Sequence, residues 1–471
     1  MIDPAPSADA RLGWRFPATF WFANVAELFE RAAFYGMFIT LRDYLGQNIG
    51  FGDVYAGVVA GGFSLLLYTL PAFLGPLADK LGFRAALMLA FALLTAGYAL
   101  LGAFTLKSTA IMSLLLIVGG GAIVKPVISG TASKCSDAVN RARAFSIFYL
   151  MVNIGAFSGK TFAPFIRQGL GMRYINFYAA ALAFAGLLLV ALAYRNPDSQ
   201  GMGKSFGDVA RAFGKVICNW RFMALIVIVS GFWTIQGQLY AAMPAYIFRL
   251  RGADARPEWL ANINPLIVMT CVVWVTHLVR NFRPENSIAI ALFIIPFSAL
   301  APTFAPALER AYGQSISILG LFSLHPITLM VIVGIAFQGF GECFLSPKFM
   351  EYASKQAPPG EEGLYMGFQH LHSSIAWLVA FVLSGHLLDR YCPDPLKLQK
   401  SAPEVYRQWE AAIAGTAPFP DAYASAHYLW YVYAAIGVGA FFALLVFKYI
   451  TMRIDRRSAR LAAAIPGSPV G

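Results

Sequence analysis

Apolar segments about 20 residues long recur along the whole chain, and they constrain its fold more than any other feature. Each segment is close to the ~20 residues that an α-helix needs to cross a bilayer. Only 13% of the 471 residues are charged, whereas soluble domains average about 25%. The sequence therefore predicts an all-α membrane protein with twelve transmembrane helices. The segments are 17–41, 55–78, 85–106, 109–133, 144–168, 174–194, 222–247, 258–279, 287–305, 326–348, 364–388 and 427–449.

Lysine and arginine are unevenly distributed among the loops that join these segments. They are more frequent in the loops that face the cytoplasm when the N-terminus is cytoplasmic, and an excess of positive charge marks the inner side. We therefore expect a multi-pass protein of the inner (cytoplasmic) membrane with both termini in the cytoplasm. The net charge of +12 reflects this bias and contact with anionic lipid, and it requires no nucleic-acid partner.

The twelve segments form two groups of six, joined by a short linker. Apolar residues of this linker, from Phe206 to Ile217, recur at helical spacing between charged ones, which predicts an interfacial helix on the inner leaflet. The outer loop over 389–426 is expected to be solvated, with one short helix. The expected parts are an N-terminal half (1–194), a linker (195–221), a C-terminal half (222–450) and a cytoplasmic tail (451–471).

The first segment carries charged residues that a membrane helix does not normally contain. Glu27, Glu30 and Arg31 stand at i, i+3 and i+4, so they share one helical face. Each ionised side chain at the centre of a membrane helix costs about 2.5–3.5 kcal/mol on insertion scales. The three residues must therefore face protein or water and pair with one another. Asn24 and Tyr35 extend the same face by a turn in each direction.

Two lysines also lie inside apolar segments. Lys125 precedes Pro126 in the fourth segment, too deep to reach the headgroups easily, and we expect it to face a cavity. Lys160 lies seven residues after Asn153 in the fifth segment, so these two side chains share a face.

Several of these runs together resemble one known family. They are Glu27-x-x-Glu30-Arg31-x-x-Phe34-Tyr35-Gly36, Lys125-Pro126, Phe148-Tyr149-x-x-Val152-Asn153-x-Gly155, Asn264-Pro265 and Gly341-Glu342-x-Phe-Leu-Ser346-Pro347. The chain resembles the proton-coupled oligopeptide transporters, a branch of the major facilitator superfamily. The loop from Gly75 to Arg84 is similar to the signature loop of that superfamily. The resemblance implies a fold of two six-helix halves.

The resemblance also implies roles for individual residues. It assigns proton coupling to Glu27, Glu30 and Arg31, and it assigns the structural or gating loop to Asp79 and Arg84. In the family, cations receive the solute carboxylate and a glutamate of the tenth helix receives its amino group. The substrate-binding residues implied here are Tyr35, Phe38, Tyr68, Lys125, Asn153, Lys160, Gln236, Asn264 and Glu342.

Two positions depart from the family pattern. Phe38 stands where an arginine is usual, and Gly237 stands where a glutamate is usual between Gln236 and Gln238. One cation and one anion are lost together, which keeps the intramembrane charge balanced if Lys160 faces the cavity. Losing the arginine predicts a ligand range shifted from ordinary di- and tripeptides, unless Arg42, one turn further along, replaces it.

The predicted function is that of a proton-coupled symporter of a peptide or peptide-like solute, which works by alternating access. The alternative is a proton-linked exporter, or a transporter of a non-peptide solute, on the same fold. No nucleophile elbow, phosphate-binding loop or metal-ligand spacing occurs in the sequence, so we expect no enzyme activity and no metal site. The expected partners are protons, a small solute and the lipid bilayer. No cofactor is expected, because a proton gradient supplies the energy.

Overall fold

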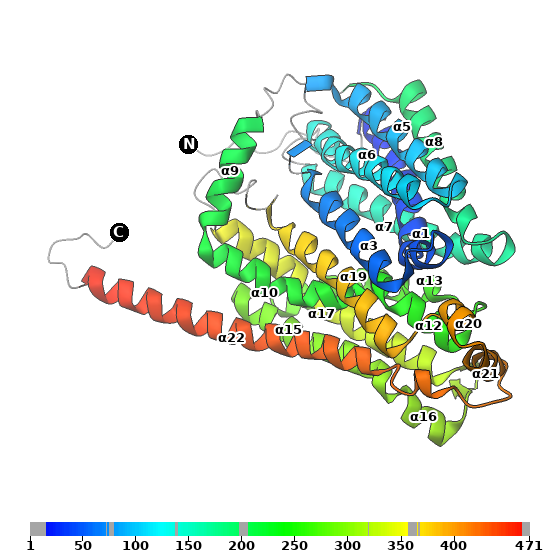
Figure 1. Cartoon of the computed structure of the whole chain (residues 1–471). Helices are drawn as coiled ribbons and strands as arrows, with labels where there is room; N and C mark the ends of the chain where they lie inside the picture. The colour runs from blue at the N-terminus through cyan, green and yellow to red at the C-terminus, as the bar shows by residue number, and fades with distance from the viewer. Residues whose placement is uncertain are drawn as a thin grey trace. The chain divides into compact units, whose positions relative to one another are not determined.

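The structure is a computed structural model of the whole chain (Figure 1). It describes residues 16–71, 73–74, 80–136, 140–196, 206–318, 320–356, 365 and 368–463. Within these ranges almost every element is a helix, and the strands form a single short hairpin.

The first part of the chain contains six long helices. Short helical turns follow the first of them at α2 (Leu41–Asp43) and at the π-helical turn η2 (Tyr44–Asn48). The long helices are α1 (Ala18–Phe38), α3 (Gly52–Thr69), α5 (Phe83–Ala103), α6 (Lys107–Lys134), α7 (Arg141–Gly169) and α8 (Arg173–Ala193).

The second part begins with α9 (Phe206–Cys218), which lies in the predicted linker. The long helices that follow are α10 (Trp220–Gln236), α14 (Ile263–Leu278), α15 (Pro284–Leu300), α17 (Pro326–Gln356), α19 (Leu371–Tyr391) and α22 (Tyr428–Ala463). The short elements are α11 (Gln238–Ala241), α12 (Met243–Arg251), α13 (Pro257–Leu260), η3 (Ala301–Phe304), α16 (Ala305–Tyr312), β1 (Ile316–Ile318), β2 (Phe322–Leu324), α20 (Pro395–Ser401), α21 (Pro403–Ile413) and η4 (Asp421–Tyr423).

The helices match the twelve predicted membrane segments. In the described part of the chain, nine helical stretches are long and apolar enough to cross a bilayer. The long helices α1, α3 and α7 occupy the first, second and fifth predicted segments. The prediction of an all-α, twelve-helix membrane protein is therefore confirmed.

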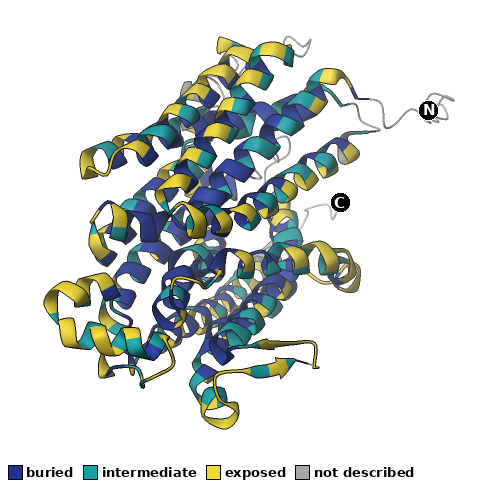
Figure 2. Cartoon of the chain, turned by 90° about the vertical axis from the view of Figure 1, so that its right-hand side faces the viewer, coloured by how far each residue is buried: buried dark blue, intermediate teal, exposed yellow. Residues whose placement is uncertain are grey.

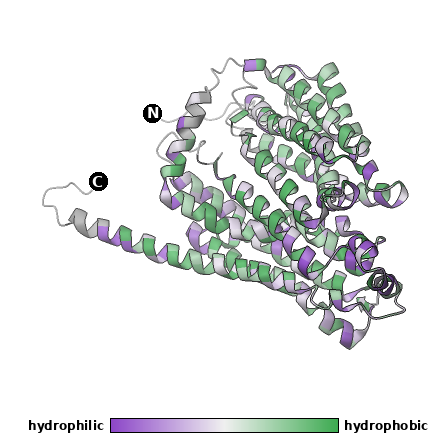
Figure 3. Ribbon diagram, in the orientation of Figure 1, coloured by the Kyte–Doolittle hydropathy of each residue, from purple (hydrophilic) through white to green (hydrophobic). Residues whose placement is uncertain are grey.

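Many apolar side chains lie on the outside of the bundle. The most exposed include Leu192, Trp274 and Val273, at 85%, 84% and 74%. Exposed surfaces of this kind face lipid in a membrane protein, since a soluble monomer rarely exposes large apolar patches. Yellow exposed positions occur along many helices in Figure 2, and Figure 3 shows hydrophobic colour along most of α22, with hydrophilic colour toward its C-terminal end.

The chain divides into two compact units that do not follow the sequence order of the helices. Unit 1 comprises 1–210, 238–265 and 378–426, and unit 2 comprises 211–237, 266–377 and 427–471. Unit 1 therefore contains the first six long helices together with α11, α12, α13, α20, α21 and most of α19. The division into six-helix halves at the linker stays a prediction.

Helix α1 packs closely on α7 in unit 1, and glycine makes this approach possible. A Cβ added to Gly155 would lie 2.6 Å from the carbonyl oxygen of Leu28 and 2.8 Å from the Cβ of Arg31. A larger residue would push the two helices apart, as expected for small residues at membrane-helix contacts. Gly155 thus fixes the turn of α1 that carries Arg31.

Several features of the structure differ from the sequence prediction. The loop over 389–426 contains two α-helices, α20 and α21, rather than one. The hairpin β1–β2, in which Ile316 pairs with Leu324, was not predicted. The seventh membrane segment is interrupted, because α10 ends before Gly237 and α11 and α12 follow as separate short helices. In contrast, α6 continues through Pro126 as one helix.

Candidate functional site

The three charged residues of α1 contact one another as their spacing predicts. Arg31 Nε lies 3.2 Å from Glu27 Oε1, and it donates a hydrogen bond to Glu30 Oε2. Both glutamates are only 1% exposed. Glu27 Oε2 is buried and has no hydrogen-bond partner within the described residues. One guanidinium therefore serves two buried carboxylates, and one carboxylate oxygen is left without a donor.

Lys125 lies on α6 near this cluster without forming an ion pair. Its ammonium is 5.5 Å from the centre of the Tyr68 ring on α3, close enough for a cation–π contact. The charges that act on it are those of Glu27, Glu30 and Arg31. In the described part of the chain no carboxylate lies within ion-pair distance of Lys125, so its charge remains available to a further anion.

Lys160 is the most buried lysine of the candidate site. Its side chain on α7 is 1% exposed, and its ammonium donates to the carbonyl oxygen of Ala261 at 3.2 Å. The centres of the Tyr35 and Tyr240 rings each lie 5.8 Å from this ammonium. No carboxylate among the described residues forms an ion pair with it. Lys160 is therefore a buried cation surrounded by aromatic faces.

Phe38 lies fully buried among aromatic rings of unit 1. It stacks on Phe34 with ring centres 4.8 Å apart, and it also contacts Phe63, Tyr240 and Phe381. The departure from arginine thus places an apolar ring where the family has a charge.

Unit 2 contains a second polar group of the predicted site. Gln236, the last residue of α10, donates from Nε2 to Glu342 Oε2 on α17 at 2.7 Å. Gln236 is 9% exposed, and its Oε1 has no hydrogen-bond partner within the described residues. Gly237 follows directly as the residue after the helix end. The amide and the carboxylate predicted from the sequence therefore meet.

The other predicted residues are placed as follows. Asn153 on α7 donates to the carbonyl oxygen of Tyr149, one turn earlier in the same helix. Asn264 is 8% exposed near the start of α14. Arg84, in the first turn of α5, donates through its backbone N–H to Asn196 Oδ1 and through Nη2 to the carbonyl oxygen of Ala191, both at 2.7 Å. Asp79 lies outside the described residues.

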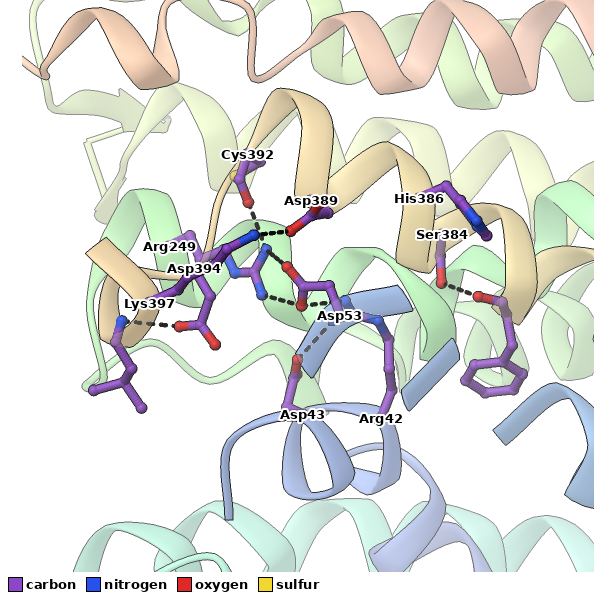
Figure 4. Close-up of polar contacts among 12 residues, drawn as sticks. Arg42, Asp43, Asp53, Arg249, Ser384, His386, Asp389, Cys392, Asp394 and Lys397 are labelled. Atoms are coloured by element: carbon purple, nitrogen blue, oxygen red, sulfur yellow. Dashed lines mark hydrogen bonds and ion pairs between the residues drawn. The ribbon is translucent and has the colours of Figure 1, made fainter. Parts of the chain in front are cut away.

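A buried ion cluster that the sequence did not reveal lies at the end of unit 1 where α1 ends and α3 begins. Asp53, in the first turn of α3, accepts hydrogen bonds from Arg42 and from Arg249 on α12 (Figure 4). Arg42 Nη2 and Arg249 Nη2 each lie 2.6 Å from Asp53 Oδ1, and Arg249 Nη1 lies 3.0 Å from Oδ2. The two arginines are 2% exposed, and Asp43 accepts a further bond from Arg42. We call these four residues the Asp53 cluster.

A third arginine, Arg167, also forms several hydrogen bonds within unit 1. Arg167, in the last turn of α7, donates to Glu258 at 2.7 Å and to the carbonyl oxygens of Ala253 and Ala255 at 2.7 and 2.6 Å. Its guanidinium also lies 4.5 Å from the centre of the Phe248 ring. Charge-assisted bonds of this kind are the stronger hydrogen bonds in proteins. Helix α7 is thereby tied to α13 and to the segment that precedes it.

Comparison with known proteins agrees with this architecture. The family model described as Major Facilitator Superfamily matches residues 20–312. The dipeptide and tripeptide permease B of Xenorhabdus bovienii is 23% identical over 429 residues, which cover 78% of this chain and 86% of the permease. The multidrug resistance protein MdtH of Proteus mirabilis is 20% identical over 346 residues, which cover 73% of this chain and 80% of that protein.

Solved structures show the same fold. A peptide transporter POT in complex with sulfate superposes with a TM-score of 0.67 at 18% identity, covering 93% of this chain and 95% of that one. A POT family transporter in complex with 5-aminolevulinic acid gives a TM-score of 0.67 at 18% identity, covering 92% and 96%. The chain belongs to the major facilitator superfamily, and its fold is that of the POT family of transporters.

Proposed function

We propose that this protein is a proton-coupled symporter that moves a peptide or a peptide-like small solute by alternating access. The observation that carries the proposal is the pair of buried carboxylates on α1. Glu27 and Glu30 share a single guanidinium, that of Arg31, and Glu27 has an oxygen with no donor. A buried carboxylate that lacks a donor is a group that can take up a proton, because its charged form is poorly solvated.

Protonation at this cluster would change the pairing of Arg31. When one carboxylate is neutral, the guanidinium loses half of the negative charge that holds it. Arg31 and the nearby Lys125 then become more available to a solute anion. Uptake of a proton and binding of an anionic solute are thereby linked through the same guanidinium.

Each unit, taken by itself, contains polar groups whose charge suits one of the end groups of a peptide. Lys125 and Lys160 are cations without ion-pair partners among the described residues, which suits a carboxylate. Glu342, held by Gln236 at 2.7 Å, suits an amino group. The relatives named for dipeptide and tripeptide permeases, and the POT structure with bound 5-aminolevulinic acid, support a solute that carries both groups. We propose further that the protein lies in the inner membrane with both termini in the cytoplasm, binds no cofactor and is not an enzyme.

A non-peptide solute or export is the second candidate. Two observations favour it: the chain is 20% identical to a multidrug resistance protein over 73% of its length, and Phe38 and Gly237 replace charged residues of the family pattern. The cluster on α1 would couple protons in either case, so the two candidates differ in solute and direction rather than in energy source.

The test is transport by the Glu30→Gln variant in proteoliposomes with an imposed pH gradient. An amide retains hydrogen bonding but cannot titrate, so we expect concentrative uptake of a labelled dipeptide to be lost, whereas exchange without a gradient persists. Asp455→Asn is the matched control, since this carboxylate is 61% exposed and pairs with Arg221 on unit 2. Concentrative uptake by Glu30→Gln at the wild-type level would show that Glu30 is not a proton site.

A further inference from the structure

The segment 392–413 of unit 1, which contains the short helices α20 and α21, contacts the Asp53 cluster through Arg249. The indole N–H of Trp409 on α21 donates to the backbone carbonyl oxygen of Arg249 at 2.7 Å. The Tyr406 ring, three residues earlier on α21, stacks on Trp409 with ring centres 5.6 Å apart. One side of α21 is thus directed at the backbone of the residue that bridges to Asp53.

The same segment also holds the side chain of Arg249. Arg249 Nη1 donates to the carbonyl oxygen of Cys392 at 2.5 Å. Cys392 is fully buried, and the residues after it are fixed in turn, because Asp394 caps α20 and the carbonyl oxygen of Pro393 accepts from the Tyr423 hydroxyl at 2.8 Å. Figure 4 shows Cys392, Arg249 and Asp53 together.

Helix α12 needs such support because it is short. It has nine residues, Met243–Arg251, and it ends at Gly252, which has a positive φ of 82°. A Cβ added to Gly252 would lie 2.8 Å from Ile413 Cγ2 at the end of α21, so the turn after α12 packs directly on α21. Arg249 is therefore held at its guanidinium, at its carbonyl oxygen and at the turn that follows it, each time by the segment 392–413.

We propose that the segment 392–413 is a latch that positions Arg249 for its ion pair with Asp53 and so sets how readily this end of the protein opens. In this role Trp409 is a positioning residue, because it acts through Arg249. The inference rests on the proposed function in one respect, namely that opening and closing at the Asp53 cluster serve transport. The contacts of segment 392–413 with Arg249 do not depend on that function.

The latch is testable by labelling a buried position beneath the cluster. Ala60 on α3 is fully buried and lies seven residues after Asp53, on the same face of the helix. In a variant without the five natural cysteines, we would introduce Ala60→Cys and measure its reaction with a membrane-impermeant maleimide on cells and on inverted vesicles. Ser64→Cys, at another fully buried position of α3, serves if the first reporter folds poorly.

Replacing Trp409 by phenylalanine removes the N–H that donates to the Arg249 carbonyl oxygen and keeps an aromatic ring, so it should weaken the latch moderately. We expect Trp409→Phe to raise the labelling rate about 2- to 10-fold, the range that one net hydrogen bond allows. Asp53→Asn should raise the rate at least as much, and combining both changes should add nothing to Asp53→Asn alone. Tyr406→Phe is the matched control, since it removes a polar group from the same helix that does not reach Arg249.

Two outcomes would overturn the proposal. One is a labelling rate for Trp409→Phe equal to that of Tyr406→Phe. The other is a general loosening, in which Trp409→Phe also raises the labelling of Ala132→Cys, a buried position near the opposite end of unit 1. The readout requires no solute, so failure of the latch is distinguishable from failure of the proposed transport, which the uptake assay measures separately.

Discussion

Lys160 is a buried cation that forms no ion pair with any described residue. Replacing it by methionine tests whether this lysine serves transport at a cost in folding free energy. Its ammonium is 1% exposed and is bound by one carbonyl oxygen, with two ring centres at 5.8 Å. Burying an ammonium costs several kcal/mol even after relaxation. One hydrogen bond from a charged group returns about 1.5–3 kcal/mol, and cation–π contacts near the 6 Å limit add about 0.5–1 kcal/mol each. Together these contacts return about 2.5–5 kcal/mol, which at most offsets the several kcal/mol that burial costs.

We therefore expect Lys160→Met to stabilise the protein. Methionine has a similar length and fills irregular space without a charge. A gain of about 1–3 kcal/mol is expected, in the range found when buried ions are replaced by well-packed apolar side chains. The unfolding entropy of globular proteins is about 2.1 cal/mol/K per residue, so for a chain of this size the melting temperature should rise by roughly 1–3 °C.

The same substitution should reduce transport. If Lys160 meets the carboxylate of the solute, Lys160→Met should lose uptake of a free dipeptide although the protein is more stable. The matched control is Lys348→Met. Lys348 is also buried, at 5% exposure, but its ammonium pairs with Glu351 at 2.8 Å and with two carbonyl oxygens. That change should lower the melting temperature, because it removes a satisfied cation and takes a donor from two carbonyl oxygens, although Glu351 keeps its pair with Lys355 at 2.6 Å.

Thermal unfolding in detergent and uptake in proteoliposomes together decide the matter. A lower melting temperature for Lys160→Met would mean that the ammonium has a stabilising partner in the folded protein, which contradicts the reasoning. A higher melting temperature with unchanged uptake would mean that this lysine has no part in transport. Only greater stability combined with lost uptake supports the proposed role.

Three further predictions concern Lys125 on α6, the ligand range and the Asp53 cluster. Lys125→Ala should abolish uptake and Lys125→Arg should leave little, since a planar guanidinium does not replace a compact ammonium; full uptake by Lys125→Ala would show that the lysine is structural. Because Phe38 cannot grip a carboxylate, amidated or larger apolar ligands should raise the melting temperature in thermal-shift assays more than unmodified dipeptides do, and the reverse ranking would refute this. Burial raises the pKa of Asp43 to about 6, above its exposed value of about 4. At a pH between about 4 and 6, the closed cluster therefore holds a proton that the open cluster releases, and lowering the pH favours the closed form. Measured relative to a fully exposed cysteine at the same pH, since the thiolate is the reacting form, labelling of Ala60→Cys should therefore be slower at pH 5 than at pH 7, and Asp43→Asn should remove this relative difference.

The parts of the candidate site that the sequence predicted are those with local geometry. Glu27, Glu30 and Arg31 contact one another because residues three and four apart share a helical face, whatever the rest of the fold does. The twelve helices were predictable for a similar reason, since each depends only on the length and polarity of its own segment. The contact between Gln236 and Glu342 spans 106 positions, and although the resemblance to a family assigned both residues to the site, neither it nor their spacing predicted the contact.

The Asp53 cluster could not be predicted in this way. Asp53 and Arg249 are 196 residues apart, and each lies beside the end of an apolar segment, where charged residues are ordinary. No spacing rule connects them, because their contact depends on how whole helices pack. The same holds for α20 and α21. Their polar sequence predicts a solvated loop, and the contact of Trp409 with Arg249, 160 residues apart, is visible only in the structure.

The charged groups of unit 1 that are buried or half-buried fall into two classes, and the distinction bears on mechanism. Arg249 and Arg167 each donate several hydrogen bonds to acidic groups and backbone carbonyls, so removing a partner from either would leave a buried charge uncompensated. Lys125, Lys160 and one oxygen of Glu27 lack such partners within the described residues. A stable protein gains nothing from incompletely paired charges in a membrane. Their presence beside clusters with several ion pairs suits a proton-coupled carrier, because groups that must exchange a proton or a solute cannot also be permanently satisfied by the protein.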